Sequence, residues 1–249
     1  MYKERPKILT IAGFDPSGGA GILADIKTFE AHKCLGFAVI TANTIQSESE
    51  FIAPNWINED EVLNQLRFIL KQHRFEYVKI GLIPSLEFLT RLNSELINHY
   101  PSLKIIWDPI LSASTGFDFK HDLSALKEML KDIYLITPNW EEIKQLSGNE
   151  DAKMGAEELS QFTSVYLKGG HNEKDPGKDY LFFEGKVYPL NPKNKKPIYP
   201  KHGSGCVFSS ALTANLASGF PILKAALRSK RYVEKYLSSS STLLGYHKL

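Results

Sequence analysis

Two glycine-rich turns near opposite ends of the chain carry the strongest chemical signal in this sequence. The first covers residues 13–21 (GFDPSGGAG) directly after an apolar run, and the second covers 202–206 (HGSGC) directly before a helical pattern. Each turn places unhindered backbone N–H groups at the start of a helix, where the aligned peptide dipoles favour an anion. Two such turns predict one site for a substrate and one for a phosphate donor.

The second turn gives the sharper signal. Gly203 and Gly205, on either side of Ser204, let the backbone approach an oxyanion closely, and Cys206 falls in the first turn of the following helix. The helix dipole stabilises a thiolate there, so we expect the pKa of the Cys206 thiol to be lowered. The alternative is a cysteine that is a small buried apolar residue. His202 is either a substrate or phosphate contact or a surface residue.

The first turn is accompanied by groups that could bind a small polar ring. Asp25 follows the turn by one helical turn, and its carboxylate could accept a hydrogen bond from a ring amine or hydroxyl. Gln46, just past the second expected strand, offers both a donor and an acceptor to the edge of a heterocycle. The alternatives are a tight strand–helix connection for residues 13–21 and a position on the loop surface for Gln46.

Neither turn is one of the two common nucleotide-binding signatures. Gly13 and Gly18 have the spacing of a P-loop, but Gly19 and Ala20 stand where that loop needs Lys and Ser or Thr. Residues 19–24 match the dinucleotide fingerprint formally, yet the match lies inside the helix start and the second strand ends without an acid for a ribose. We therefore expect neither P-loop nor hydride-transfer chemistry.

Oxygen ligands and a lysine follow three further strands. Asp108 and Glu142 fit a metal–water network, since Mg²⁺ keeps several waters and takes only one or two carboxylates. Asn139 with Glu142 three residues later also makes a good capping box, and both interpretations can hold together. Lys168, two residues before Gly170, ends a strand as a nucleotide-phosphate contact would.

Short β-rich runs alternate with amphipathic helical stretches, which predicts a mostly parallel sheet covered on both faces. The expected strands are 8–12, 37–42, 77–80, 104–107, 134–137 and 165–168, followed by an antiparallel hairpin at 179–183 and 187–190. The expected helices include one after Asn58, then 86–100, 124–132 and 140–146, one from about Val207 that stops at Gly219, and one opened by Pro221. In such sheets the ligand crevice lies beyond the carboxyl ends of the strands, where the polar residues above are found.

Length, charge and cysteine content narrow the class of protein. A chain of 249 residues with 43% hydrophobic content can form one large α/β domain, so we expect residues 1–249 to be a single domain. A net charge of +2 gives no case for nucleic-acid binding, although Lys193, Lys195, Lys196 and Lys201 form a basic loop that is either solvated or phosphate-facing. Two cysteines are too few for a disulfide framework, and no apolar stretch approaches membrane-spanning length. A cytoplasmic protein without a membrane partner is the default expectation.

Taken together, these segments resemble the hydroxymethylpyrimidine/phosphomethylpyrimidine kinases of thiamine biosynthesis, which belong to the ribokinase-like superfamily. Residues 11–29 resemble the opening of that family, and VITA (39–42), KIGL (79–82), DP (108–109), ITPN (136–139), KGGH (168–171) and HGSGC follow in the family's order. The resemblance covers about residues 8–219. It implies a ribokinase-like three-layer α/β/α fold and an ATP- and Mg²⁺-dependent kinase. The substrate would be 4-amino-5-hydroxymethyl-2-methylpyrimidine and then its monophosphate.

The resemblance also implies roles for individual positions. The residues that would hold the pyrimidine are Gly13, Gly18, Gly19, Asp25 and Gln46. Those that would form an anion hole over the transferring phosphoryl group are Gly203, Ser204, Gly205 and Cys206, with Cys206 as a candidate base. Those that would organise Mg²⁺ and the nucleotide are Asp108 and Glu142 for the metal, and Asn139, Lys168, Gly170 and His202 for the nucleotide. The family precedent is a homodimer.

Two other functions stay open. A pyridoxal or pyridoxine kinase on the same fold is the main alternative, because a pyridine alcohol presents similar ring edges and the same hydroxymethyl group. A non-catalytic protein that binds a vitamin precursor is the other, although the retained Asp108, Glu142 and glycine turn argue against it. Residues 198–201 (IYPK) depart from the threonine- and asparagine-containing stretch of the family, which leaves open a kinase that performs only the first phosphorylation.

Overall fold

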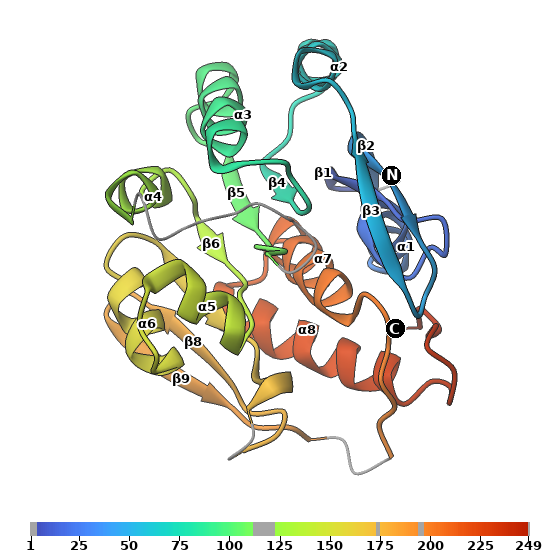
Figure 1. Ribbon diagram of the computed structural model, residues 1–249, viewed down its shortest axis with the longest axis vertical. Helices are drawn as coiled ribbons and strands as arrows, with labels where there is room; N and C mark the ends of the chain where they lie inside the picture. The colour runs from blue at the N-terminus through green and yellow to red at the C-terminus, as the bar shows by residue number, and fades with distance from the viewer. Residues whose placement is uncertain (1–3, 112–122, 173–174, 194–196, 249) are drawn as a thin grey trace.

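One nine-stranded sheet organises the computed structural model, which describes residues 4–111, 123–172, 175–193 and 197–248 (Figure 1). Its strand order is β3-β2-β1-β4-β5-β6-β7-β8-β9. The strands are β1 (Lys7–Phe14), β2 (Leu35–Gln46), β3 (Phe51–Trp56), β4 (Tyr77–Ile80), β5 (Lys104–Trp107), β6 (Leu135–Ile136), β7 (Ser164–Leu167), β8 (Asp179–Phe183) and β9 (Lys186–Leu190). β1, β2 and β4 to β7 are parallel, whereas β3, β8 and β9 pair antiparallel with their neighbours. The predicted mostly parallel sheet with a C-terminal antiparallel hairpin is confirmed.

Helices cover both faces of this sheet. They are α1 (Gly21–Ala31), α2 (Glu59–Gln72), α3 (Leu86–His99), α4 (Leu123–Leu130), α5 (Trp140–Ser147), α6 (Ala152–Leu159), α7 (Ser204–Ala217) and α8 (Ile222–Leu237), with a 3₁₀ turn at Gly169–His171. The apolar core on one face is shared with α2 to α6, and the cores on the other face are shared with α1, α7 and α8. The expected three-layer α/β/α architecture is therefore present.

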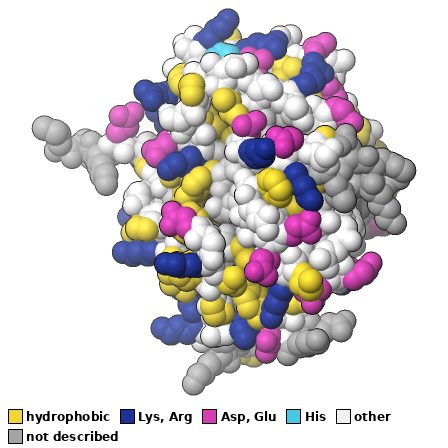
Figure 2. All heavy atoms as spheres, turned by 90° about the vertical axis from the view of Figure 1, so that its left-hand side faces the viewer, with side chains coloured by type: hydrophobic (Ala, Val, Ile, Leu, Met, Phe, Trp, Pro, Cys, Tyr) yellow, Lys and Arg dark blue, Asp and Glu magenta, His cyan; other side chains and the backbone are white. Residues whose placement is uncertain are grey.

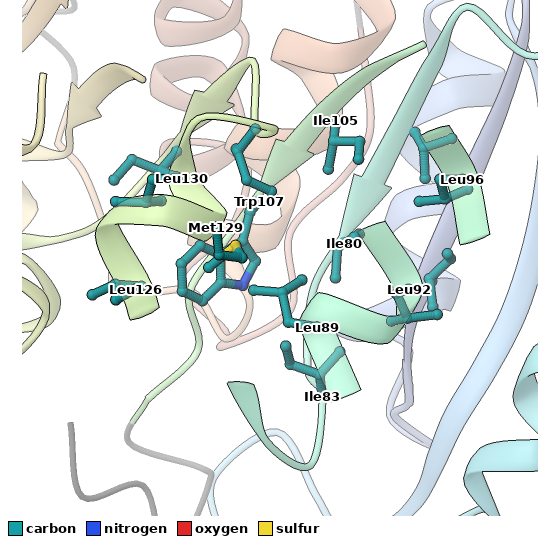
Figure 3. Close-up of a cluster of buried hydrophobic side chains, with 14 of the residues drawn as sticks. Ile80, Ile83, Leu89, Leu92, Leu96, Ile105, Trp107, Leu126, Met129 and Leu130 are labelled. Atoms are coloured by element: carbon teal, nitrogen blue, oxygen red, sulfur yellow. The ribbon is translucent and has the colours of Figure 1, made fainter. Parts of the chain in front are cut away.

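Alternating side chains along the strands divide the core between these two layers. In β5, Ile105 and Trp107 join the core beneath α2 to α6, whereas Ile106 joins the core beneath α7 and α8. Figure 3 shows Trp107 beside Met129 of α4 and Leu89 of α3. Burying one such side chain stabilises the fold by roughly 1.5–3 kcal/mol. This packing fixes the carboxyl end of β5, from which Asp108 follows directly.

Local signals set several helix ends. The side chain of Asn58 accepts hydrogen bonds from the backbone N–H groups of Asp60 and Glu61, so it caps α2 as predicted. Asn139 and Glu142 form a complete capping box at the start of α5. These caps satisfy N–H groups that have no partner within the helix, and the second one brings the Glu142 carboxylate to the end of β6.

Two elements go beyond the sequence prediction. Strand β3 pairs antiparallel with β2, which continues to Gln46 instead of stopping at residue 42. Pro54 and Asn55 obscure the strand pattern of β3, and proline is tolerated there because β3 lies at the edge of the sheet. The short helix α6 contains Gly155, a poor helix former. The extension of β2 matters for function because it carries Gln46 beyond the ends of the central strands.

Positive and negative side chains are interspersed over the face of the molecule shown in Figure 2. Lys201 from the predicted basic loop turns inward, and its Nζ donates to the carbonyls of Ser240 and Thr242, each at 2.7 Å. Lys195 and Lys196 lie outside the described residues. No helix within the described ranges is long and apolar enough to cross a membrane.

Candidate active site

A cavity of about 610 Å³ lies where the parallel strands end at their carboxyl side. Thr44, Gln46 and Phe51 from β2 and β3 line it toward one edge of the sheet, and Val233 and Leu237 from α8 line it toward the other. The residues between these two regions come from strand ends and from both glycine turns, and they include Gly13, Gly21, Asp108, Asn139, Glu142, Lys168, Gly170, His202, Gly203, Ser204, Gly205 and Cys206. The predicted crevice is thus confirmed, and its volume suits ligands of a few hundred daltons.

The two glycine turns adjoin along one wall of this cavity. Gly203 has a left-handed φ of +69°, and a Cβ atom there would lie 2.0 Å from the carbonyl oxygen of Gly19. The backbone N–H of Gly21 donates to the sulfur of Cys206. The turns therefore touch through backbone atoms, which only glycine permits at Gly203. Segments separated by almost the whole chain form one surface.

Only some of the substrate residues predicted in and near the first turn line the cavity. Gly13 and Gln46 line the cavity, and the amide of Gln46 donates to the Thr44 hydroxyl at 2.8 Å. Gly18 and Gly19 do not line it. The carbonyl of Gly18 accepts from Lys27 Nζ at 2.8 Å on the outer side of the turn. These two glycines shape the turn without lining the cavity, so a direct substrate contact through them finds no support in the cavity geometry.

Asp25 also departs from its predicted position. Its side chain is fully buried and does not line the cavity; one oxygen lies 2.7 Å from Nζ of Lys79 and the other accepts from the Thr10 hydroxyl at 2.6 Å. The Ser210 hydroxyl also donates to it. Burial disfavours charge on Lys79, but the carboxylates of Asp25 and Asp108 hold the pKa of Lys79 above its usual value. Asp25 supports the site from below instead of presenting a carboxylate to a ligand.

Cys206 lies where predicted, in the first turn of α7 and lining the cavity, but its pKa moves in the opposite direction from the prediction. Burial raises the pKa of the thiol to about 11, with further contributions from the carboxylates of Asp108 and Asp25. The nearby Lys79 ammonium and the Gly21 amide oppose this rise without cancelling it. The helix dipole alone is therefore a poor guide to this thiol, which is protonated at neutral pH.

Lys168 connects the two carboxylates that follow β5 and β6. Its Nζ lies 2.9 Å from Asp108 Oδ1 and 3.7 Å from Glu142 Oε2, and it would lie 3.2 Å from a Cβ atom placed on Gly205. Burial opposes ionisation of Asp108, but Lys168 and Lys79 hold the pKa of that carboxyl below its usual value. Burial raises the pKa of Glu142, Lys168 opposes that rise and Asp108 adds to it. A cation thus sits between two carboxylates at the mouth of the glycine turn.

The donor set around Lys168 fits Mg²⁺ held through water. Within the described ranges no group of three or more His, Cys, Asp or Glu side chains could enclose a metal ion. Asp108 and Glu142 supply two carboxylates, the number that Mg²⁺ commonly takes from a protein. The side chain of Asn139 is occupied by the cap of α5, so its predicted nucleotide contact would have to come from its remaining polar atoms. The structure therefore shows the predicted cap, and the ligand contact of Asn139 stays a prediction.

A second buried ion pair lies at the α8 side of the cavity and was not expected from the sequence. Lys230 Nζ lies 2.7 Å from Asp179 Oδ2, and both residues line the cavity. Asp179 also accepts from the Tyr166 hydroxyl at 2.6 Å and from the backbone N–H of Gly169 at 2.6 Å. Gly170 lines the same region, and a Cβ atom there would meet nothing within 4 Å. Asp179 and Lys230 occupy ordinary strand and helix patterns, which hide their proximity.

Fold and site together define a small-molecule phosphotransferase. Backbone N–H groups at a helix start, a lysine beside two carboxylates, and a cavity at the sheet edge are what phosphoryl transfer needs for positioning and charge stabilisation. Residues 15–248 match the family described as phosphomethylpyrimidine kinase. This chain belongs to that family, as its motifs predict.

Comparison with individual proteins agrees with this assignment. A hydroxymethylpyrimidine/phosphomethylpyrimidine kinase of Staphylococcus aureus is 32% identical over 244 residues, which are 92% of this chain and 87% of that relative. The structure of an ADP complex of Bacillus subtilis pyridoxal kinase matches with a TM-score of 0.84 at 26% identity, over 98% of this chain and 97% of that one. A phosphomethylpyrimidine kinase of Clostridium difficile matches with a TM-score of 0.76 at 30% identity, over 93% and 99%. The predicted ribokinase-like fold and kinase activity are confirmed.

Proposed function

We propose that this protein uses ATP to phosphorylate 4-amino-5-hydroxymethyl-2-methylpyrimidine and then its monophosphate, in thiamine biosynthesis. Family membership and the names of its relatives support this reading. The observation that carries it is the adjoining of the two glycine turns, which puts Gly13 and the 203–206 turn on one cavity. A substrate alcohol and a phosphate donor can therefore meet there.

The pyrimidine would lie toward the β2–β3 side of the cavity. Gln46 can accept a hydrogen bond from the exocyclic amine of the ring, because its own amide N–H is directed at Thr44. Phe51 and Leu82 line the same region and supply apolar surface for the ring faces. Gly13 lets the ring approach the backbone. Asp25 contributes indirectly by fixing Lys79 beneath this end.

The nucleotide would extend from the second glycine turn toward α8. The first N–H groups of α7, from Ser204 to Cys206, would stabilise the charge on the transferring phosphoryl group. Lys168 adds a cation at the same position, and Gly170 and His202 line the nucleotide side. As the hydroxymethyl oxygen bonds to phosphorus, the bond to the departing ADP oxygen breaks, and the alcohol releases its proton to water.

Mg²⁺ is part of this proposal. Asp108 and Glu142 would hold it through water, and the ion when bound would supply positive charge to the phosphate oxygens. Lys168 keeps both carboxylates in place by its two ion contacts. Removing divalent cations with a chelator is expected to abolish turnover, and adding Mg²⁺ back is expected to restore it.

The raised pKa of Cys206 argues against its role as a base, because a thiol with a pKa of about 11 holds its proton at neutral pH. Phosphoryl transfer depends mainly on positioning and charge stabilisation, so a strong base is not required. Single-turnover rates of Cys206→Ala and Cys206→Asp separate the two roles. We expect the alanine variant to stay within tenfold of the parent rate. A loss beyond a hundredfold that the aspartate variant restores would establish the base.

A pyridoxal kinase is the second candidate, favoured by the TM-score of 0.84 to the Bacillus subtilis pyridoxal kinase. The experiment is ADP formation measured with the pyrimidine alcohol and with pyridoxal under the same conditions. We expect kcat/KM to be at least tenfold higher for the pyrimidine. The reverse ratio would move the assignment to the pyridine alcohol, and no ADP with either would favour a binding protein. Mass spectrometry of the products would show whether the second phosphorylation follows the first.

We also propose that the protein is a homodimer that pairs through β2 and β3. Ile45 is 48% exposed and Ile52 is 66% exposed on these strands, and β3 is an edge strand that would otherwise stay open to other chains. Light scattering after size exclusion should give twice the monomer mass, and Ile52→Glu should reduce it. A single kinase domain in the cytoplasm completes the proposal, which cell fractionation and limited proteolysis would test.

A further inference from the structure

Asp15 is a buried carboxylate that the assigned site does not use. Its side chain is 1% exposed and does not line the cavity. Oδ1 accepts from the backbone N–H of Ser17 at 2.8 Å, and Oδ2 accepts from the backbone N–H of Ala20 at 2.7 Å and from the Ser17 hydroxyl at 2.9 Å. These bonds fold the first glycine turn around the carboxylate. Burial raises the pKa of Asp15, but a hydrogen bond from His202 and these turn bonds together lower it to about 2.

The remaining hydrogen bond of Asp15 connects the first glycine turn to the second one. Nε2 of His202 lies 2.9 Å from Asp15 Oδ2. The His202 ring packs against Gly19, where a Cβ atom would lie 2.7 Å from the ring Cδ2. The backbone N–H of His202 donates to the carbonyl of Leu243 at 2.9 Å. His202 is thus held from three directions, and it also lines the cavity.

The residues immediately after His202 make this bond significant. Gly203 comes next, in the left-handed conformation and against the carbonyl of Gly19, and Ser204 begins α7. Any movement of His202 relative to the first turn therefore moves the backbone N–H groups that would bind the phosphoryl group. Misplacement of such groups by about 1 Å can lower a rate by roughly a hundredfold.

We propose that Asp15 is a positioning residue for phosphoryl transfer, which holds the 203–206 turn in register with the substrate turn through its bond to His202. The proposal rests on the proposed kinase function. Asp15 touches neither substrate in this arrangement and acts only through the imidazole. His202 is correspondingly a link between the two turns as well as a wall of the cavity.

The test is a set of variants assayed at saturating substrates. Asp15→Asn replaces the carboxylate by a neutral amide, which weakens the bond from His202 and leaves the Ser17 N–H opposed by the amide NH₂. His202→Ala removes the link. We expect each to lower kcat by ten- to a hundredfold while the KM of the alcohol changes less than threefold. His202→Gln keeps an N–H donor and should recover most of the loss. The double variant Asp15→Asn/His202→Ala should be no slower than the worse single variant. A loss below fivefold in either single variant, or losses that multiply in the double variant, would overturn the proposal.

A matched control separates positioning from stability. Asp151 also accepts two backbone N–H groups, those of Lys153 and Met154, but at the start of α6, away from the cavity. Asp151→Ala removes that helix cap, so it should lower the melting temperature while leaving kcat unchanged. Equal losses of kcat in both variants would show that Asp15 serves folding alone.

A measurement of nucleotide binding tests the positioning role of Asp15 without using the alcohol substrate. Calorimetry compares the affinity for the ATP analogue AMP-PCP with that for ADP, both with Mg²⁺. Asp15→Asn should weaken AMP-PCP at least fivefold more than ADP, because only AMP-PCP places a group on the 203–206 turn. Equal weakening of both would contradict the positioning role. A parent protein that binds AMP-PCP but phosphorylates neither alcohol would remove the proposed function and leave this comparison valid.

Discussion

Lys79 Nζ lies 2.7 Å from Oδ1 of Asp25, and neither side chain is exposed to solvent. The pair joins β4 to α1 and lies near Cys206. Lys79 lowers the pKa of the Cys206 thiol, and Asp25 raises it. Buried ion pairs are costly to form, so their value lies in what they hold in place. Here the pair fixes β4 relative to α1, and the Ser210 hydroxyl, which donates to Asp25, adds α7.

Breaking this pair is expected to destabilise the protein strongly. Lys79→Met leaves the Asp25 carboxylate buried without its cation, which costs about 3–5 kcal/mol of unfolding free energy in comparable pairs. Urea unfolding measures the loss. Asp25→Leu combined with Lys79→Met should be less damaging than Lys79→Met alone, because no charge is then left unpaired. Arg67→Gln, which breaks a partly exposed pair with Glu95, is the control and should cost about 1 kcal/mol or less. A Lys79→Met variant as stable as this control would refute the structural role of the pair.

The sequence predicts the sheet and the place of the site well, because both follow from periodicity along the chain. Buried parallel strands are apolar runs, and polar residues at their ends stand out against them. Strand β3 escapes prediction because Pro54 and Asn55 suit only an edge, which is a property of the assembled sheet. The motifs in turn predict the family, since their order along the chain matches it.

Contacts between distant segments are what the sequence does not reveal. Lys79 lies inside an apolar strand, so the sequence indicates that its charge needs a partner. Nothing in the sequence identifies that partner as Asp25. Position at a helix start predicts a low pKa for Cys206, whereas burial between carboxylates raises it. Both errors arise because local rules ignore the charges that tertiary packing brings nearby.

The raised pKa of Cys206 predicts a pH-dependent contribution to stability. The folded protein keeps the thiol proton up to about pH 11, whereas the unfolded chain loses it near 9. The folded state then binds more protons, so this contribution is complete below pH 9 and is lost as the pH rises toward 11, with a slope of about 1.4 kcal/mol per pH unit. The difference in unfolding free energy between the parent and Cys206→Ala should shrink over this interval. A difference that does not change with pH would contradict the raised pKa.

Close approach of the two turns predicts an unusual sensitivity at Gly203. Alanine there combines a left-handed backbone with a Cβ atom 2.0 Å from the Gly19 carbonyl oxygen, so the turns must separate. Gly219 is a matched control, because its φ is +83° but a Cβ atom would meet nothing within 4 Å. Gly219→Ala should cost about 1–2 kcal/mol, the backbone strain alone, and keep full activity. Gly203→Ala should cost more and lose most of its kcat. Equal effects on stability and activity would mean that the turns do not depend on this contact.

Lys168 should be needed for turnover more than for folding. Its ammonium faces the second glycine turn and neutralises Asp108 and Glu142. Lys168→Met therefore removes the positive charge that would stabilise the transferring phosphoryl group. We expect kcat to fall by roughly a hundredfold or more, as for other groups that stabilise transition-state charge, with a native circular dichroism spectrum. Lys127→Met, which breaks a partly exposed pair with Glu158, serves as the control and should keep full activity. A Lys168→Met variant within fivefold of the parent kcat would exclude this role.

A crystal structure with the pyrimidine alcohol and AMP-PCP bound together would decide whether the two substrates meet in this cavity. We expect the alcohol beside Gly13 and Gln46, the terminal phosphoryl group on the N–H groups of Gly203 to Cys206, and the hydroxymethyl oxygen within reach of its phosphorus. The two ligands bound in separate places, or the phosphoryl group held away from the 203–206 turn, would contradict the proposed phosphoryl transfer.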